Sequence, residues 1–215
     1  MFGTQVQQRA RSIAEQIVRP VAALRISPNM VSFAGLILNA VAALVIALGP
    51  LRWGGALVLF SGVFDMFDGA VARVQKKSST FGAFLDSTLD RYAEGLLFLG
   101  IIFHATRVEH ASGTLTTLLA LAYGAAILSL IVSYTRARAE GLGMECKVGI
   151  MERPERVLLL GIGLLIGNEI GLLWMLVAFV VLTGFTGLQR IIHVWRTSAP
   201  ESAGHPPKTT ARRMP

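Results

Sequence analysis

The chain is poor in charged residues and in cysteine for its 215 residues. Charged residues make up 15% of it, against roughly 25% in an ordinary soluble domain, so an ordinary soluble protein is not expected. The single cysteine, Cys146, excludes an internal disulfide and a cysteine-rich metal site. No histidine lies beside cysteine or carboxylates at the spacing of a metal site. The sequence also shows no internal repeat of fixed period.

Long apolar blocks are what the chain has instead. Hydrophobic residues account for 53% of it, and the mean hydropathy is +0.59. A helix needs about 20 mostly apolar residues to cross a bilayer, and only the fifth of six blocks is clearly shorter. We therefore predict an all-α integral membrane protein with six transmembrane helices, at residues 30–48, 53–72, 81–103, 114–134, about 154–167 and about 172–194.

The two ends of the chain differ from these blocks. Residues 4–20 are polar with apolar residues every three or four positions, which predicts an amphipathic helix on the membrane surface. Residues 198–215 are rich in Pro, Thr, Lys and Arg, a composition typical of disorder. We expect one membrane domain over residues 1–197 and a disordered cytoplasmic tail over residues 198–215.

The basic residues are distributed unevenly between the blocks. The chain carries 20 Lys and Arg against 13 Asp and Glu, a net charge of +7. Arg52 and Arg107 alone lie on one side of the predicted spans, and 17 basic residues, those of the chain ends included, lie on the other. Because basic loops stay in the cytoplasm, both termini are expected there. Positive charge beside apolar blocks favours anionic lipid headgroups or a phosphorylated substrate as partners, and not nucleic acid.

Four aspartates interrupt the second and third apolar blocks. Asp65 and Asp68 are three residues apart, and Asp86 and Asp90 are four apart, so each pair shares a helix face. An Asp at the centre of a membrane helix costs about 2.5–3.5 kcal/mol, so something must compensate. The short loop predicts that the two helices are antiparallel neighbours with facing carboxylates. Oxygen ligands favour Mg²⁺ or Mn²⁺, and two ions would balance four carboxylates.

Three alternative roles for the aspartates are open besides metal binding. Buried ion pairs with Arg73 and Arg91 would neutralise only two of the four carboxylates. A proton or cation pathway, as in a carboxylate-lined cation transporter, needs acids across the membrane, and the last three blocks hold none at mid-depth. An intramembrane aspartyl protease needs a single Asp pair.

Polar residues elsewhere near these blocks have simpler expected roles. Asn39, in the middle of the first block, is expected to form an interhelical hydrogen bond. Arg153 is expected to pair with Glu140, Glu152 or Glu155. The role of Glu94, one turn after Asp90, is left open between support of the site and a polar cavity.

The aspartates belong to a longer pattern with eight fixed residues. It reads Asp65-x2-Asp68-Gly69-x2-Ala72-Arg73-x8-Gly82-x3-Asp86-x3-Asp90. At every fixed position it resembles the signature of the CDP-alcohol phosphatidyltransferases. The resemblance implies a homodimeric membrane enzyme that transfers a phosphatidyl group from CDP-diacylglycerol to a hydroxyl and releases CMP. It implies that the four aspartates ligate the metal ions and that Asp90 is also the catalytic base.

The same resemblance implies where the CDP-lipid binds. Its nucleotide is expected at Gly69, Arg73 and Ser79, and at Asn29 and Ser32 where the first block begins. Many relatives carry Asp and Thr at the last two positions. The alternative for Asn29 and Ser32 is helix capping, which Asn and Ser favour.

Three later stretches, at residues 134–140, 152–156 and 189–195, resemble actinobacterial phosphatidylinositol-phosphate synthases. In those proteins a Lys and two Arg bind the phosphate of inositol 1-phosphate, and the corresponding residues here are Arg136, Arg156 and Arg190. Arg136 keeps the charge of the Lys but replaces a point charge by a planar fork. The resemblance implies inositol 1-phosphate as the acceptor, in a prokaryotic cell membrane with the active site facing the cytoplasm. Glycerol 3-phosphate as acceptor, CDP-archaeol as donor, and arginines that merely touch lipid phosphates are the alternatives.

Overall fold

The structure, a computed structural model, describes residues 27–74, 79–109 and 113–198, with the backbone alone for residues 28 and 66–74. These residues fold into helices, and the described ranges contain no strand. The predicted all-α class is therefore confirmed. The helices are α2 (Pro28–Leu48), α3 (Leu51–Val74), α4 (Thr80–Arg107), α5 (Thr114–Gly141), α6 (Arg153–Ile166) and α7 (Glu169–Ser198).

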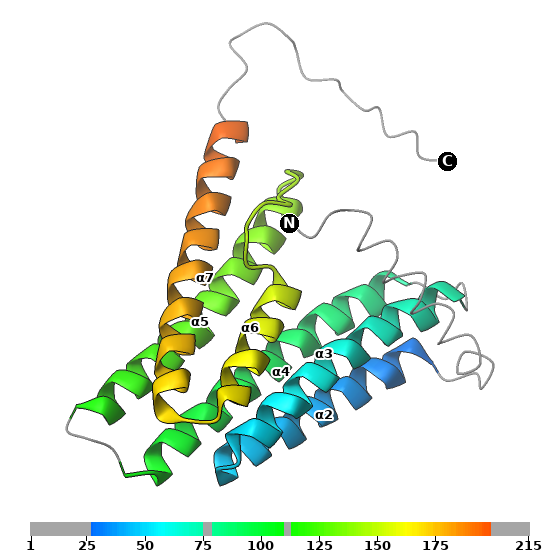
Figure 1. Ribbon diagram of the computed structural model, residues 1–215. Helices are drawn as coiled ribbons and strands as arrows, with labels where there is room; N and C mark the ends of the chain where they lie inside the picture. The colour runs from blue at the N-terminus through cyan, green and yellow to red at the C-terminus, as the bar shows by residue number, and fades with distance from the viewer. Residues whose placement is uncertain (1–26, 75–78, 110–112, 199–215) are drawn as a thin grey trace, which may run out of the picture.

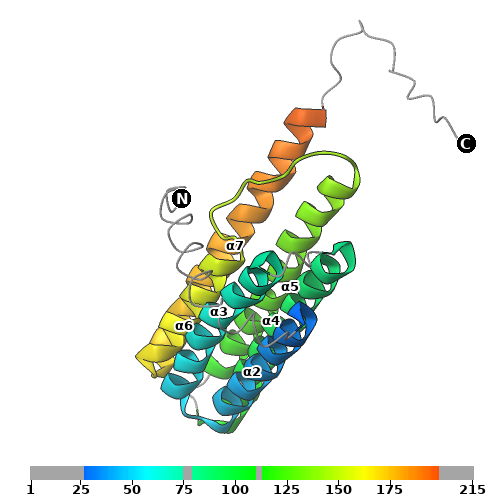
Figure 2. The same ribbon diagram turned by 90° about the vertical axis from the view of Figure 1, so that its right-hand side faces the viewer.

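The six helices form one bundle, shown from two sides in Figures 1 and 2, and their contacts close into a ring. Around the ring each helix contacts the next in the order α2, α4, α5, α7, α6, α3 and back to α2. The centre of the ring is apolar, and Phe98 of α4 packs edge-to-face on Phe179 of α7 with ring centroids 5.1 Å apart. The ring brings α6, which comes late in the chain, against α3.

One predicted neighbour relation is wrong. The short loop between α3 and α4 was expected to make these helices direct neighbours, yet in the part of the chain that the structure describes they do not pack on each other. Helix α2 packs against both. Glycine allows part of this close packing, because a Cβ on Gly100 of α4 would collide with the backbone of Ala43 in α2.

Membrane-spanning capacity varies among the helices. By length and composition, three described helices could cross a membrane: Asn29–Leu48, Thr114–Gly141 and Glu169–Ser198. Helices α3 and α4 carry the aspartates, and α6 has 14 residues, about 21 Å at 1.5 Å per residue. The outer surface exposes large apolar side chains such as Ile37, Phe60 and Trp174, as expected of an integral membrane protein. The predicted surface helix at residues 4–20 and residues 199–215 of the predicted tail lie outside the described residues.

A polar contact links α2 and α3 inside the ring. The buried Asn39 amide donates hydrogen bonds to Ser61 Oγ at 2.5 Å and to the Gly35 carbonyl oxygen at 3.0 Å. This contact confirms the predicted interhelical role of Asn39.

Candidate active site

Two aspartates from different helices converge on one arginine. Arg153, the first residue of α6, places Nη2 2.7 Å from Asp65 Oδ2 of α3 and 2.8 Å from Asp90 Oδ1 of α4. All three side chains are largely buried. The expected partners of Arg153 were nearby glutamates, and that expectation is wrong because packing of α6 on α3 puts its first turn over the aspartates.

The other two aspartates lie one turn from these. Asp86 of α4 is close enough to Asp65 and Asp90 to act electrostatically on both carboxylates. Asp68 lies on the backbone of α3 one turn after Asp65, and its side chain is outside the described residues. Asp65 of α3 and Asp86 and Asp90 of α4 thus face a common space, although in the described residues the two helices do not pack directly. Of the two alternative ion pairs, the one with Arg91 is present, because Arg91 Nη1 lies 3.7 Å from Asp90 Oδ2. The side chain of Arg73 is not described.

Helix α2 leaves room for Asp65. A Cβ added to Gly35 would stand 2.8 Å from Asp65 Oδ1, which is closer than such atoms approach without a shift. Glycine at this position therefore lets the carboxylate lie directly against the α2 backbone. The sequence signature does not include Gly35, so only the packing of α2 against α3 reveals this role.

The carboxylates fit a hard cation. Among the side chains that the structure describes, no three of His, Cys, Asp and Glu form a metal-binding cluster. Asp65 and Asp90 nevertheless both contact the single charge of Arg153, with Arg91 3.7 Å from Asp90 alone and with Asp86 in electrostatic range. Carboxylate oxygen is the ligand that Mg²⁺ and Mn²⁺ prefer. The donor set at this point is therefore suited to a divalent ion.

Two of the residues expected to bind the nucleotide come from different helices and meet at Gly82. A Cβ on Gly82 would stand 3.4 Å from Asn29 Oδ1 and 3.0 Å from Ser79 Oγ. Ser79 also caps α4 by accepting a hydrogen bond from Gly82 N at 2.9 Å. The residue that caps α2 is Ser27, so capping does not explain Asn29 or Ser32.

The remaining two residues of that set, Gly69 and Arg73, lie on the α3 backbone at the same end of the helix as Asp65. The Arg73 side chain is outside the described part of the structure. Their predicted contacts with the nucleotide therefore stay predictions.

Arg156 is held in a buried ion pair. Its Nε and Nη2 donate to Glu94 Oε1 and Oε2 at 2.7 and 3.1 Å, and its Nη1 donates to the Met151 carbonyl oxygen at 3.2 Å. Only 3% of the Arg156 side chain and 11% of the Glu94 side chain are exposed. The pair joins α4 to α6 one helical turn away from the Arg153 contact. It gives Glu94, whose role the sequence left open, a partner in the structure.

The other two arginines expected to bind the acceptor differ in exposure. Arg190 is buried in α7 and donates from Nε to the Val148 carbonyl oxygen at 2.9 Å and from Nη1 to that of Val132 at 2.5 Å. Arg136 of α5 is partly exposed, with 37% of its side chain accessible, and its Nε donates to Glu140 Oε1 at 2.9 Å. Arg190 lies within electrostatic range of both Arg136 and Arg156. The fold therefore brings together three arginines from three helices.

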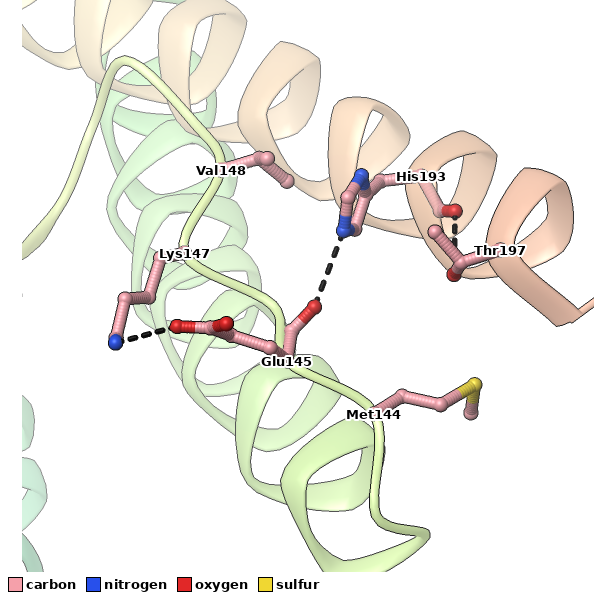
Figure 3. A pocket seen from close by; sticks show the side chains of 6 residues that line it. All are labelled: Met144, Glu145, Lys147, Val148, His193 and Thr197. Carbon is pink, nitrogen blue, oxygen red and sulfur yellow. Dashed lines mark hydrogen bonds and ion pairs between the residues drawn. The ribbon is translucent and has the colours of Figure 1, made fainter.

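A cavity of about 390 Å³ lies between the α5–α6 loop and the C-terminal part of α7 (Figure 3). His193 Nε2 lies 3.1 Å from the Glu145 carbonyl oxygen, and Lys147 pairs with the Glu145 carboxylate. The hydrogen bond between Lys147 Nζ and the Glu145 carboxylate lowers the pKa of Glu145 and raises the pKa of Lys147. The lining residues are Met144, Glu145, Lys147, Val148, His193 and Thr197.

Comparison with known proteins decides the family. The model of the CDP-alcohol phosphatidyltransferases matches residues 25–185. The chain belongs to this family. It is therefore an enzyme of phospholipid synthesis, as its eight-residue signature predicted.

Relatives of this CDP-alcohol phosphatidyltransferase are inositol lipid synthases. The archaetidylinositol phosphate synthase of Methanothermobacter thermautotrophicus is 40% identical over 86% of this chain and 92% of its own length. The phosphatidylinositol phosphate synthase of Mycolicibacterium smegmatis is 38% identical over 71% of this chain and 69% of its own. The predicted resemblance to phosphatidylinositol-phosphate synthases is thereby confirmed.

Solved structures agree with this relation. The crystal structure of Mycobacterium tuberculosis phosphatidylinositol phosphate synthase with CDP-DAG bound has a TM-score of 0.77 and 28% identity, covering 91% of this chain and 99% of that one. The structure of the same enzyme in complex with manganese and citrate has a TM-score of 0.73 and 27% identity, covering 90% and 93%.

Proposed function

We propose that this enzyme transfers a phosphatidyl group from CDP-diacylglycerol to a hydroxyl of inositol 1-phosphate and releases CMP. The observation that carries the proposal is the convergence of Asp65 of α3 and Asp90 of α4 on the same arginine, Arg153. Relatives named for inositol phosphate lipids support the acceptor, and a similar structure with CDP-DAG supports the donor.

The chemistry is an in-line displacement at the phosphorus of the phosphatidyl group. The acceptor oxygen forms the new bond to phosphorus, the bond to the CMP oxygen breaks, and Asp90 accepts the hydroxyl proton. Before a divalent ion binds, Arg153 and Arg91 would hold the Asp90 carboxylate in position.

The divalent cations would be held by Asp65, Asp68, Asp86 and Asp90. When bound, two Mg²⁺ or Mn²⁺ ions neutralise the pyrophosphate and stabilise the charge that develops on the leaving oxygen. The similar structure with manganese and citrate supports a divalent ion, and the four carboxylates support two.

Substrate binding is divided between two groups of residues. Asn29, Ser32, Gly69, Arg73 and Ser79 hold the CDP group, and the meeting of Asn29 and Ser79 at Gly82 supports this. The acceptor phosphate would bind in a site formed by Arg136 of α5, Arg156 of α6 and Arg190 of α7. The partly exposed Arg136 would exchange Glu140 for the phosphate, while the buried Arg156 and Arg190 shape the wall behind it.

The proposed setting is a prokaryotic cell membrane. Six spans and a surface helix at residues 4–20 would form a membrane domain over residues 1–197, with a disordered tail over residues 198–215. Both termini and the active site face the cytoplasm because the basic residues gather on that side. The enzyme acts as a homodimer, as the family resemblance implies.

One observation favours a second donor. The relative that is 40% identical is an archaetidylinositol phosphate synthase, so CDP-archaeol is the alternative to CDP-diacylglycerol. Glycerol 3-phosphate, the alternative acceptor, requires the same kind of basic cluster.

A substrate panel tests the proposal. The purified protein in lipid is given Mg²⁺ or Mn²⁺, CDP-diacylglycerol or CDP-archaeol, and one of inositol 1-phosphate, glycerol 3-phosphate, free inositol or serine. We expect CMP release with inositol 1-phosphate alone and none from Asp90→Asn. Release with glycerol 3-phosphate instead would refute the acceptor and keep the reaction class. A preference for CDP-archaeol would replace the donor.

A further inference from the structure

Two ion pairs, one above the other, attach the first turn of α6 to α4. Arg153 and Arg156 lie three residues apart on α6, and Asp90 and Glu94 lie four apart on α4, so both helices present these residues on one face. Arg153 pairs with Asp90, and Arg156 pairs with Glu94. We call these the outer pair and the inner pair.

The inner pair is a fixed contact. Two guanidinium nitrogens meet two carboxylate oxygens, the backbone of Met151 accepts a third hydrogen bond, and both side chains are almost fully buried. Removing one partner would leave a buried charge without its counterion, which is strongly unfavourable. We therefore expect Arg156 to stay paired with Glu94.

The outer pair is built differently. A single nitrogen of Arg153, Nη2, contacts both Asp65 and Asp90, and within the described residues Arg153 makes no other polar contact. Its side chain is 26% exposed, against 3% for Arg156. Arg153 thus acts on the two carboxylates as a point charge, not as a two-pronged clamp, and it has a route to solvent.

The position of this charge has a chemical consequence. Asp65 and Asp90 are two of the four proposed metal ligands, and the Arg153 guanidinium lies between their oxygens. A guanidinium and a divalent cation repel each other strongly at contact distance in a partly buried site. Both cannot use the same oxygens at once.

We propose that Arg153 is a displaceable countercharge of the metal site, a positioning residue that neutralises Asp65 and Asp90 until a divalent cation replaces it. This inference rests on the proposed function for its metal ligands. Once released, the Arg153 guanidinium can donate two parallel hydrogen bonds, and phosphate oxygens are the acceptors that suit this geometry best. The released Arg153 guanidinium would then be available to the phosphates of the substrate.

Binding of Mn²⁺ to the full-length protein in lipid nanodiscs, followed by electron paramagnetic resonance, tests the inference. Arg153→Gln removes the guanidinium that contacts both Asp65 and Asp90 and leaves only Arg91, 3.7 Å from Asp90 Oδ2, so we expect the Mn²⁺ dissociation constant to fall about tenfold. Arg153→Lys keeps the charge and should bind Mn²⁺ like the wild type. The matched control Arg156→Gln removes the inner pair and should not tighten binding. Unchanged or weaker binding in Arg153→Gln overturns the inference.

Thermal unfolding gives a second readout. Without metal, Arg153→Gln should unfold at a lower temperature than the wild type, and saturating Mn²⁺ should close the gap because the cation takes over the same charge balance. The gap for Arg156→Gln should persist with and without Mn²⁺. A gap for Arg153→Gln that Mn²⁺ leaves unchanged would show a merely structural role and overturn the inference.

The wild-type protein provides a test that needs no variant. Phenylglyoxal modifies accessible guanidinium groups, and mass spectrometry locates the modified arginine. Mn²⁺ should increase modification of Arg153, CDP-diacylglycerol added with Mn²⁺ should reduce it again, and Arg156 should stay unmodified throughout. Modification of Arg153 that Mn²⁺ does not change overturns the inference alone. No Mn²⁺ binding by the wild type overturns the proposed metal centre and the inference with it.

Discussion

The buried pair between Glu94 and Arg156 allows a quantitative prediction about stability. Glu94→Gln keeps the shape of the side chain but removes its charge, so Arg156, 3% exposed, loses its counterion. Two charge-assisted hydrogen bonds, at 2.7 and 3.1 Å, are weakened together. Breaking a buried pair from one side costs about 3–5 kcal/mol, so we expect the free energy of unfolding to fall by that amount.

The assay is reversible unfolding of the purified protein in mixed micelles, followed by circular dichroism. Glu140→Gln is the matched control, because Glu140 and Arg136 form an exposed pair with side chains 47% and 37% exposed. An exposed pair at this helical spacing contributes about 0.3–0.5 kcal/mol, so the control should lose no more than that. A loss in Glu94→Gln as small as in the control would refute the assignment of a buried, structural pair.

Three further predictions follow from the site and its supports. Gly35→Ala places a methyl group 2.8 Å from Asp65 Oδ1. It should reduce kcat/KM about 100-fold, since a shift near 1 Å in a reacting site has that effect. The control Gly95→Ala, whose Cβ has nothing within 4 Å, should keep wild-type kinetics. Asn39→Ala removes the hydrogen bond to Ser61 and should lower the free energy of unfolding by about 0.6–1.7 kcal/mol in the same micelle assay, and a loss of zero would contradict an energetic role for that bond. Removal of divalent ions with EDTA should abolish CMP release, and Mg²⁺ or Mn²⁺ but not Na⁺ should restore it; activity that survives EDTA would contradict the metal centre.

The sequence predicted what depends on local pattern. The apolar blocks located the helices. The block at residues 114–134 is shorter than α5, because polar residues continue that helix to Gly141. The aspartate signature identified the reaction class through its resemblance to the CDP-alcohol phosphatidyltransferases, and the family comparison confirms it. Asn39, a polar residue within an apolar block, predicted its own interhelical bond.

The sequence did not predict what depends on packing between distant segments. Chain connectivity suggested that α3 and α4 are neighbours, yet α2 packs against both. The partners of Arg153 are 88 and 63 positions away along the chain, so no local pattern could have paired them. For Glu94 the signal was present, as an acid one turn after Asp90 in an apolar block, but its partner Arg156 comes from α6.

The most direct test of the central claim follows the product. Labelled inositol 1-phosphate is incubated with the purified enzyme, CDP-diacylglycerol and Mn²⁺, and the label in the lipid fraction is compared with the CMP released. We expect label in lipid equal in amount to CMP, and none of either from Asp90→Asn. CMP release without label in lipid, or full activity in Asp90→Asn, would contradict it.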